Sequence, residues 1–104
     1  MEVRFCDDAL PEFIDGLEVS TVAKVLRTID LLEEFGHRLG MPHSKKVAGR
    51  LFELRVRGRQ EVRIFYTFYQ ETAVLLHGFV KKSQKIPRGE INLAQQKLSK
   101  LDSI

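Results

Sequence analysis

The segment LFELRVRGRQEVRIFYTFYQETAVLLHGFV, residues 51–80, decides the fold of this chain. Apolar and polar residues alternate through it with a period of two, which is typical of strands that bury one face. Gly58 and residues 70–72 interrupt the alternation, and such interruptions mark turns. The segment therefore predicts three consecutive antiparallel strands joined by two hairpins, within an antiparallel sheet built from residues 45–88.

The alternation assigns the side chains of this sheet to two faces. A slip of one residue would turn every arginine into the core, so the pairing is strongly specified. The expected core face consists of Phe52, Leu54, Val56, Val62, Ile64, Tyr66, Phe68, Val74, Leu76 and Val80. The other face consists of Leu51, Glu53, Arg55, Arg57, Glu61, Arg63, Phe65, Thr67, Ala73, Leu75, His77, Phe79 and Lys81.

Charge complementarity suggests a register for the first hairpin. Pairing Arg55 with Glu61, and Glu53 with Arg63, places opposite charges opposite one another on neighbouring strands. We expect this pairing, because like charges in the same positions would be destabilising. Across the second hairpin the expected pairs are Arg63 with Phe79 and Phe65 with His77.

A short strand and two helices are predicted ahead of this segment. Residues 1–6 alternate as a strand does. The first helix follows the N-cap candidates Asp7 and Asp8 and ends near Gly16, and the second begins near Ser20. The apolar stripe of the second helix consists of Val22, Val25, Leu26, Ile29 and Leu32.

The remaining elements complete an α+β fold. The second helix is expected to end at Phe35, with Gly36 as the residue that stops it. A loop is expected over residues 37–44, and a last helix from Pro87 to Leu101. The order is strand, two helices, three strands and a helix, which predicts one domain over residues 1–104 with the helices on one face of the sheet.

The charges are divided unevenly along the chain. Residues 1–44 hold four Lys or Arg and nine Asp or Glu, a net charge of −5, whereas residues 45–104 hold thirteen and five, a net charge of +8. Such asymmetry is a pointer to nucleic acid or another polyanion. An ordinary solvated surface is the other interpretation that charge alone allows.

Composition narrows the class of protein. Hydrophobic residues make up 43% and charged residues 30% of the chain, values typical of a globular protein. The apolar runs are shorter than the roughly 18 residues that cross a bilayer, and the N-terminus has no apolar signal region, so a cytoplasmic location is expected. Cys6 is the only cysteine, and no Cys/His cluster has zinc spacing, so we expect a structural thiol, no metal and no cofactor.

The polar face of the sheet combines cations with aromatic rings. This combination suits single-stranded RNA, since guanidinium groups hold phosphates while Phe65 and Phe79 offer bases a surface for stacking. In the other interpretation, the two phenylalanines form a minor core beneath the last helix and the charges are a solvated face. The rim of the surface would be Lys45, Lys46, Arg50, Lys82, Lys85 and Arg88.

Three segments resemble a known family: LFELRVRG (51–58), EVRIFY (61–66) and LLHGFVKKSQKIPRGEI (75–91). Together with the two-helix N-terminal half, they resemble the RelE/ParE toxin superfamily, and more narrowly its HigB-like, phage-derived branch. The similarity covers nearly the whole chain, and HGFVKKSQKIP is its most specific stretch. It implies a RelE-like βααβββα fold and the toxin of a type II toxin–antitoxin module.

The resemblance also implies a chemistry. Many members of this superfamily are ribosome-dependent endoribonucleases that cleave mRNA in the ribosomal A site. A ribose 2′-OH attacks the adjacent phosphate and leaves a cyclic phosphate, without a metal ion. This reaction requires a base, an acid and cations that stabilise the added charge on phosphorus.

Particular residues match the family's functional positions. Arg55 and Arg63 match its phosphate-binding arginines, and arginine suits this role because its planar fork holds two phosphate oxygens. Related toxins carry a tyrosine, or a histidine and a tyrosine, where this chain reads KKSQK, so the acid and base stay open among Glu53, His77 and His43. Lysines match at positions Lys81, Lys82 and Lys85 after the last strand, and at Lys45 and Lys46 ahead of the sheet.

Two other functions are compatible with the same fold and remain as alternatives. A ParE-like protein would inhibit DNA gyrase by protein contact and cleave no RNA, and an inactive phage-derived remnant would only bind its partner. The partner implied by the resemblance is a HigA-like helix-turn-helix antitoxin with acidic or apolar segments. The other predicted partner is mRNA on the ribosome.

Overall fold

The computed structural model describes residues 1–102, which form the expected α+β arrangement with one additional strand. The expected order of strand, two helices, strands and C-terminal helix is confirmed. The additional strand, β2, lies where the sequence predicted the end of a loop and the residues just beyond it. The elements are β1 (Glu2–Phe5), α1 (Ala9–Asp15), α2 (Val19–Phe35), a 3-10 turn η1 (Gly36–Arg38), β2 (Ser44–Ala48), β3 (Leu51–Val56), β4 (Val62–Tyr69), β5 (Thr72–Val80) and α3 (Arg88–Asp102).

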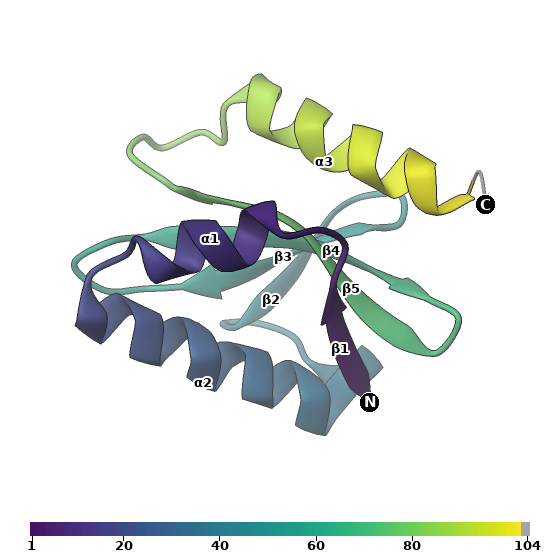
Figure 1. Cartoon of the computed structure of the whole chain (residues 1–104), viewed down its shortest axis with the longest axis horizontal. Helices are drawn as coiled ribbons and strands as arrows, with labels where there is room; N and C mark the ends of the chain where they lie inside the picture. The colour runs from purple at the N-terminus through teal and green to yellow at the C-terminus, as the bar shows by residue number, and fades with distance from the viewer. Residues whose placement is uncertain (103–104) are drawn as a thin grey trace.

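The five strands form one sheet in the order β1-β5-β4-β3-β2. β1 pairs in parallel with β5, and all other neighbours are antiparallel. Helices α1 and α2 cover one face of the sheet and α3 covers the other (Figure 1). The prediction of helices on one face only is therefore wrong, because both faces carry enough apolar side chains to bury a helix.

The first face is apolar along most of its length. Its buried cluster includes Leu54, Ile64 and Tyr66 of the sheet together with residues of α1 and α2. Helix α1 approaches closely over Gly78, where an added Cβ would lie 2.7 Å from Cδ1 of Leu10. A larger residue at this position would displace the Leu10 side chain, so glycine allows α1 to pack directly on β5.

The second face has a smaller apolar cluster beneath α3. Phe65 is 0% exposed and Phe79 is 7% exposed, and their ring centroids are 5.7 Å apart. Both rings are therefore part of a core and offer no surface on which bases can stack, which contradicts their predicted RNA contact. The cluster consists of Leu51, Phe65, Val74, Leu76 and Phe79 from the sheet and Ala94, Leu98 and Leu101 from α3.

The register of the first hairpin differs from the expectation by two residues. Arg55 lies opposite Arg63, and Glu53 lies opposite Phe65. Val56 and Val62 are the last paired residues before the turn. A shift of two residues preserves the assignment of side chains to faces, so the arginines stay on the second face.

The second hairpin contains a β-bulge that the sequence did not reveal. The expected pairing of Phe65 with His77 is confirmed, but the next pair is Tyr66 with Leu75. The extra residue reverses the direction of the side chains in the first half of β5. Leu75 therefore belongs to the first cluster and Leu76 to the second, opposite to the prediction, and Ala73 and Val74 are exchanged in the same way.

The apolar pattern of helix α2 predicted where the helix ends but not all of its buried positions. It ends at Phe35, and Gly36 has a φ of +53°, as expected for a helix stop. Leu26 was predicted to be buried but is 50% exposed, whereas Thr28 is buried and donates a hydrogen bond to the carbonyl of Lys24. No helix within residues 1–102 has the length and apolar character that crossing a bilayer requires.

Candidate nucleic-acid interface

A hollow of about 540 Å³ opens beside the charged part of the second sheet face. We call it the basic hollow. Among its eight lining residues, five carry a positive charge and one a negative charge, a formal balance of +4. The lining consists of Arg55 and Arg57 from β3 and its end, Glu61 and Arg63 at the start of β4, and Lys81, Lys82, Ser83 and Gln84 after β5.

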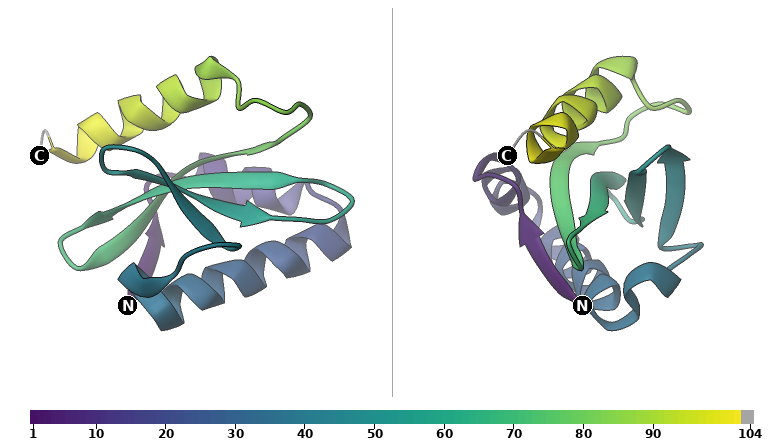
Figure 2. Two further views of the ribbon diagram at one scale, coloured as in Figure 1. Left: turned by 180° about the vertical axis from the view of Figure 1, so that it is seen from behind. Right: turned by 90° about the vertical axis from the view of Figure 1, so that its right-hand side faces the viewer.

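The connection to α3 helps to build this hollow. Residues 81–87 leave the sheet beyond β5 and bend back as a loop before α3 begins (Figure 2). The amide of Lys81 donates a hydrogen bond to the carbonyl of Glu61, at 2.6 Å. This bond fixes the start of the connection to the first hairpin, so Lys81 and Lys82 lie in the same hollow as Arg63.

Arg63 is the most buried cation of the site. It is 1% exposed, and Nη2 lies 3.1 Å from Oε2 of Glu61. Nη1 donates a bond to the carbonyl of Val62, at 3.3 Å. Because a buried charge needs partners, these contacts hold the guanidinium in a defined orientation at the wall of the hollow.

Arg55 and Glu53 form a second ion pair, in which Glu53 is buried and Arg55 is partly exposed. Nε of Arg55 lies 3.7 Å from Oε1 of Glu53, which is an ion pair but too long for a hydrogen bond. Oε2 of Glu53 also has no hydrogen-bond partner. Glu53 is 5% exposed and does not line the basic hollow, so the geometry gives it no route to a substrate there as a general base.

His77 lies apart from the arginines. Its Nε2 is in short contact with a carboxylate oxygen of Glu90 from α3. It lines a separate cavity of about 210 Å³ together with Leu10 and Phe13. The structure therefore pairs His77 with a helix carboxylate and does not bring it into the basic hollow.

The predicted lysines and Arg50 separate into two groups. Lys81 and Lys82 line the hollow, whereas Lys45, Lys46, Arg50 and Lys85 do not. Successive strand residues point to opposite faces, so Lys45 and Lys46 of β2 cannot both serve one surface. Arg50 is engaged elsewhere, because Nη1 donates to both carboxylate oxygens of Asp102, at 3.0 and 2.8 Å.

Two charged members of the hollow were not proposed as site residues from the sequence. Arg57 extends the alternation of β3 by one step beyond Arg55, so the period of two already placed it on the correct face. Glu61 was expected to pair with Arg55, but its carboxylate forms an ion pair with Arg63, two residues later in the chain. Ser83 and Gln84 carried no signal in the pattern, because they follow the last strand.

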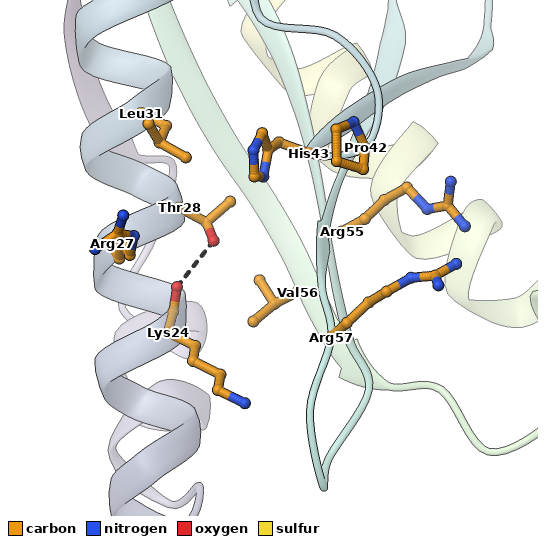
Figure 3. Close-up of a pocket in the computed structure, with 9 residues that line it drawn as sticks. All are labelled: Lys24, Arg27, Thr28, Leu31, Pro42, His43, Arg55, Val56 and Arg57. Carbon is orange, nitrogen blue, oxygen red and sulfur yellow. Dashed lines mark hydrogen bonds between the residues drawn. The ribbon is translucent and has the colours of Figure 1, made fainter.

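A second depression lies between α2 and β3, and we call it the apolar groove. Its volume is about 250 Å³ (Figure 3). The guanidinium groups of Arg55 and Arg57 extend to the side of β3 that faces away from α2. Both residues also line the basic hollow, so the two depressions meet at the end of β3. The groove is lined by Lys24, Arg27, Thr28, Leu31, Pro42, His43, Arg55, Val56 and Arg57.

The other side chains considered for chemistry are the Cys6 thiol and the acidic groups that could bind a metal ion. Burial, reinforced by the neighbouring Asp7, raises the pKa of the Cys6 thiol, whose Sγ lies 3.5 Å from the carbonyl of Leu76. A thiol held protonated is a poor nucleophile. Within residues 1–102, no group of three or more His, Cys, Asp or Glu side chains is arranged to hold a metal ion.

The comparison with protein families assigns the chain to a class. Residues 12–99 match the family described as Phage derived protein Gp49-like (DUF891), which is a RelE-like toxin family. The chain belongs to this phage-derived Gp49-like family, and membership is consistent with a toxin-like module. No curated protein matches the chain in sequence. The narrower assignment to a HigB-like branch stays a prediction.

Proposed function

We propose that this chain is the toxin of a type II toxin–antitoxin module and cleaves mRNA bound to the ribosome. The observation that carries the proposal is the basic hollow, where the side chains of Arg55, Arg63 and Lys82 share one wall. Guanidinium and ammonium groups at this density suit the phosphates of a polynucleotide. Membership of a toxin family supports the same conclusion.

The proposed reaction is attack of a ribose 2′-OH on the adjacent phosphate, without a metal ion. A bond forms between the 2′ oxygen and phosphorus while the bond to the 5′ oxygen breaks, which leaves a cyclic phosphate and a 5′-hydroxyl. The 2′-OH loses a proton and the departing oxygen gains one. Arg55 and Arg63 stabilise the added negative charge on phosphorus in the transition state.

Charge stabilisation is the main contribution that we assign to the protein. Glu61 is the one carboxylate among the eight residues of the hollow, and it is engaged with Arg63. A carboxylate in an ion pair is a weak base. We therefore propose that the ribosome orients the RNA and that the cations of the hollow lower the barrier.

The test is mRNA cleavage by the purified chain with ribosomes. Arg63→Ala should slow cleavage by about 100-fold or more, the usual effect of removing one donor to a transition-state oxyanion. Lys82→Ala, at an exposed position, reports on the site without disturbing the core. The matched control is Arg50→Ala, because Arg50 lies outside the hollow and binds Asp102. Intact mRNA with the wild-type chain would contradict the proposal.

One observation favours a second candidate, a ParE-like inhibitor of DNA gyrase. No histidine or tyrosine lines the basic hollow, and a protein that acts by contact alone needs no acid or base. A supercoiling assay separates the two functions. Inhibition of gyrase together with intact mRNA would establish the second candidate over the first.

The proposed partner is a HigA-like helix-turn-helix antitoxin encoded beside this gene. Acidic segments of such a protein would complement the formal balance of +4 in the hollow. RNA binding should weaken steeply with salt, since each phosphate contact releases a counterion. Salt-insensitive RNA binding would count against a phosphate site.

A further inference from the structure

Met41 is the most exposed of the three sulfur-bearing residues of the chain. It is 62% exposed, whereas Met1 is 37% exposed and Cys6 is partly buried. Met1 also packs over Gly36, where an added Cβ would lie 3.2 Å from its Cε. Because oxidation of sulfur follows exposure, an oxidant in solution reacts first with Met41.

A tight turn holds Met41 beside strand β3. The amides of His43 and Ser44 both donate to the carbonyl of Gly40, each at 3.0 Å. The amide of Arg55 donates in turn to the carbonyl of His43, at 2.8 Å. These bonds close the turn around Met41 and fasten it to the strand that carries Arg55.

The thioether of Met41 contacts the guanidinium of Arg55. Nη1 of Arg55 donates to Sδ of Met41, at 3.2 Å. A thioether is a weak acceptor, whereas a phosphate oxygen forms a strong, charge-assisted bond with a guanidinium. The reduced methionine therefore steadies Arg55 without competing with a phosphate for it.

We propose that Met41 is a site of oxidation by peroxides, and that its sulfoxide withdraws Arg55 from RNA. A lone pair of Sδ attacks one peroxide oxygen, so that an S–O bond forms while the O–O bond breaks. Sulfur loses two electrons, and the departing hydroxide takes the proton of the transferred oxygen and becomes water. The inference rests on the proposed function in taking Arg55 as a ligand of RNA phosphate.

The sulfoxide changes the partner that Arg55 has beside it. Oxidation converts an apolar thioether into a polar group whose oxygen accepts hydrogen bonds. The three rotatable bonds of the methionine side chain let this oxygen reach Nη1 of Arg55. RNA must then displace a bond to a charged group, which should weaken its binding by about tenfold.

The test is treatment of the purified chain with hydrogen peroxide. Mass spectrometry of peptides locates the added oxygen, and fluorescence anisotropy measures the affinity for a twelve-residue oligouridine RNA. Met41 should be oxidised before Met1, and the affinity should fall by about tenfold as the Met41 sulfoxide accumulates. Methionine sulfoxide reductases should restore the affinity, because they return the sulfoxide to the thioether.

Two variants at this exposed position separate the sulfur from its surroundings. Met41→Leu keeps the apolar volume without a sulfur, so peroxide should leave its RNA affinity at the value before treatment. Met1 and Cys6 are present in this variant, so a loss that arises from either of them would persist. Met41→Gln places a permanent acceptor oxygen beside Arg55 and should bind RNA several-fold more weakly than Met41→Leu, without peroxide.

Each result decides the inference. Resistance of Met41 while Met1 is oxidised, an unchanged RNA affinity of the sulfoxide, or an equal loss in Met41→Leu overturns it. Cleavage of mRNA with no effect of oxidation would remove the inference and leave the proposed function. Loss of RNA binding on oxidation of a chain that leaves mRNA intact would support the inference and remove only the nuclease. An untreated chain that binds no RNA overturns both.

Discussion

The two faces of the sheet differ in what covers them. The first face is apolar where it meets α1 and α2, and Leu54, Ile64 and Tyr66 are all buried there. The second face is divided into an apolar part and a charged part. Helix α3 covers the apolar part, which includes Phe79 of β5. Arg63 of β4, which pairs directly with Phe79, lines the basic hollow. The first face is covered by two helices, whereas the second supports a helix and a charged site on the same strands.

This division places the site on a rigid scaffold. Arg55 and Arg63 belong to two paired central strands, so hydrogen bonds of the sheet fix the separation of their backbones. Loop residues such as Lys82 add charge from a less constrained segment. The comparison indicates that the two arginines proposed to bind phosphate are held by the fold, and that the apolar core of the first face lies behind them.

The largest expected effect on stability comes from a substitution in the apolar core of the first face. Leu54→Ala should lower the free energy of unfolding by about 2–5 kcal/mol, the range for a fully buried leucine. Leu98→Ala on α3 should cost less, because Leu98 keeps some exposure at the margin of the smaller cluster. Urea unfolding measures both. A greater loss for Leu98→Ala would contradict the ranking of the two faces.

The next effect concerns a buried hydroxyl pair of the first face. Oγ of Ser44 and the hydroxyl of Tyr66 are 2.6 Å apart. Tyr66→Phe leaves the Ser44 hydroxyl unpaired in the core and should cost about 1–3 kcal/mol at neutral pH. Thermal unfolding at pH 7 measures the loss. An unchanged melting temperature would show that water reaches Ser44.

The same tyrosine gives a pH dependence. Burial raises the pKa of Tyr66, and the bond with Ser44 offsets only part of this. The unfolded chain releases the proton first, near pH 10, so the contribution of Tyr66 is fully present below that pH and is lost as the pH rises through the raised pKa. Tyr66→Phe should flatten the alkaline decrease in unfolding free energy, whereas the control Tyr69→Phe should retain it.

A smaller effect would sharpen the description of the second face. Glu61→Gln removes the one negative charge of the basic hollow but keeps an acceptor for Arg63. Affinity for a twelve-residue RNA should rise roughly fivefold, since one charge a few ångströms away is worth on the order of 1 kcal/mol. Fluorescence anisotropy measures this. The control is Glu71→Gln in the exposed β4–β5 turn, and equal effects of the two variants would refute a local cause.

The smallest expected effect on stability comes from an ion pair between α3 and the N-terminal segment. Nζ of Lys97 lies 3.0 Å from Oδ2 of Asp7. Partial burial of Asp7 acts against ionisation, but bonds from Lys97 and the Ala9 amide outweigh it and lower the pKa of Asp7. The stabilisation is present above the ordinary value of 3.8 and is lost as the pH falls through the lowered pKa.

Lys97→Met tests this contact. The pair is partly exposed, so its loss should lower the free energy of unfolding at pH 7 by well under about 1 kcal/mol. The difference from the wild type should shrink as the pH falls through the lowered pKa of Asp7. Lys85→Met, at an exposed position, is the control. A difference that persists unchanged in acid would assign the effect to packing of the Lys97 stem.

Local periodicity was sufficient to predict the strand faces and the end of α2 in much of this molecule. The period of two predicted which side chains of β3 and most of β4 share a face, and Gly36 marked the end of α2. The same alternation predicted, from the sequence alone, that Arg55 and Arg63 lie on one face of the sheet. These properties depend on neighbouring residues of one chain segment, so the sequence by itself determined them.

Tertiary packing decided the rest. The bulge opposite Phe65 reversed the faces of Leu75 and Leu76, and the position of α3 turned Phe65 and Phe79 from a predicted surface into a core. The observed register also placed Arg55 opposite Arg63, in place of the expected pair of Arg55 with Glu61. Each outcome depends on contacts between segments far apart in the sequence, for which local alternation carries no information; only the assembled sheet and its two helical layers select among them.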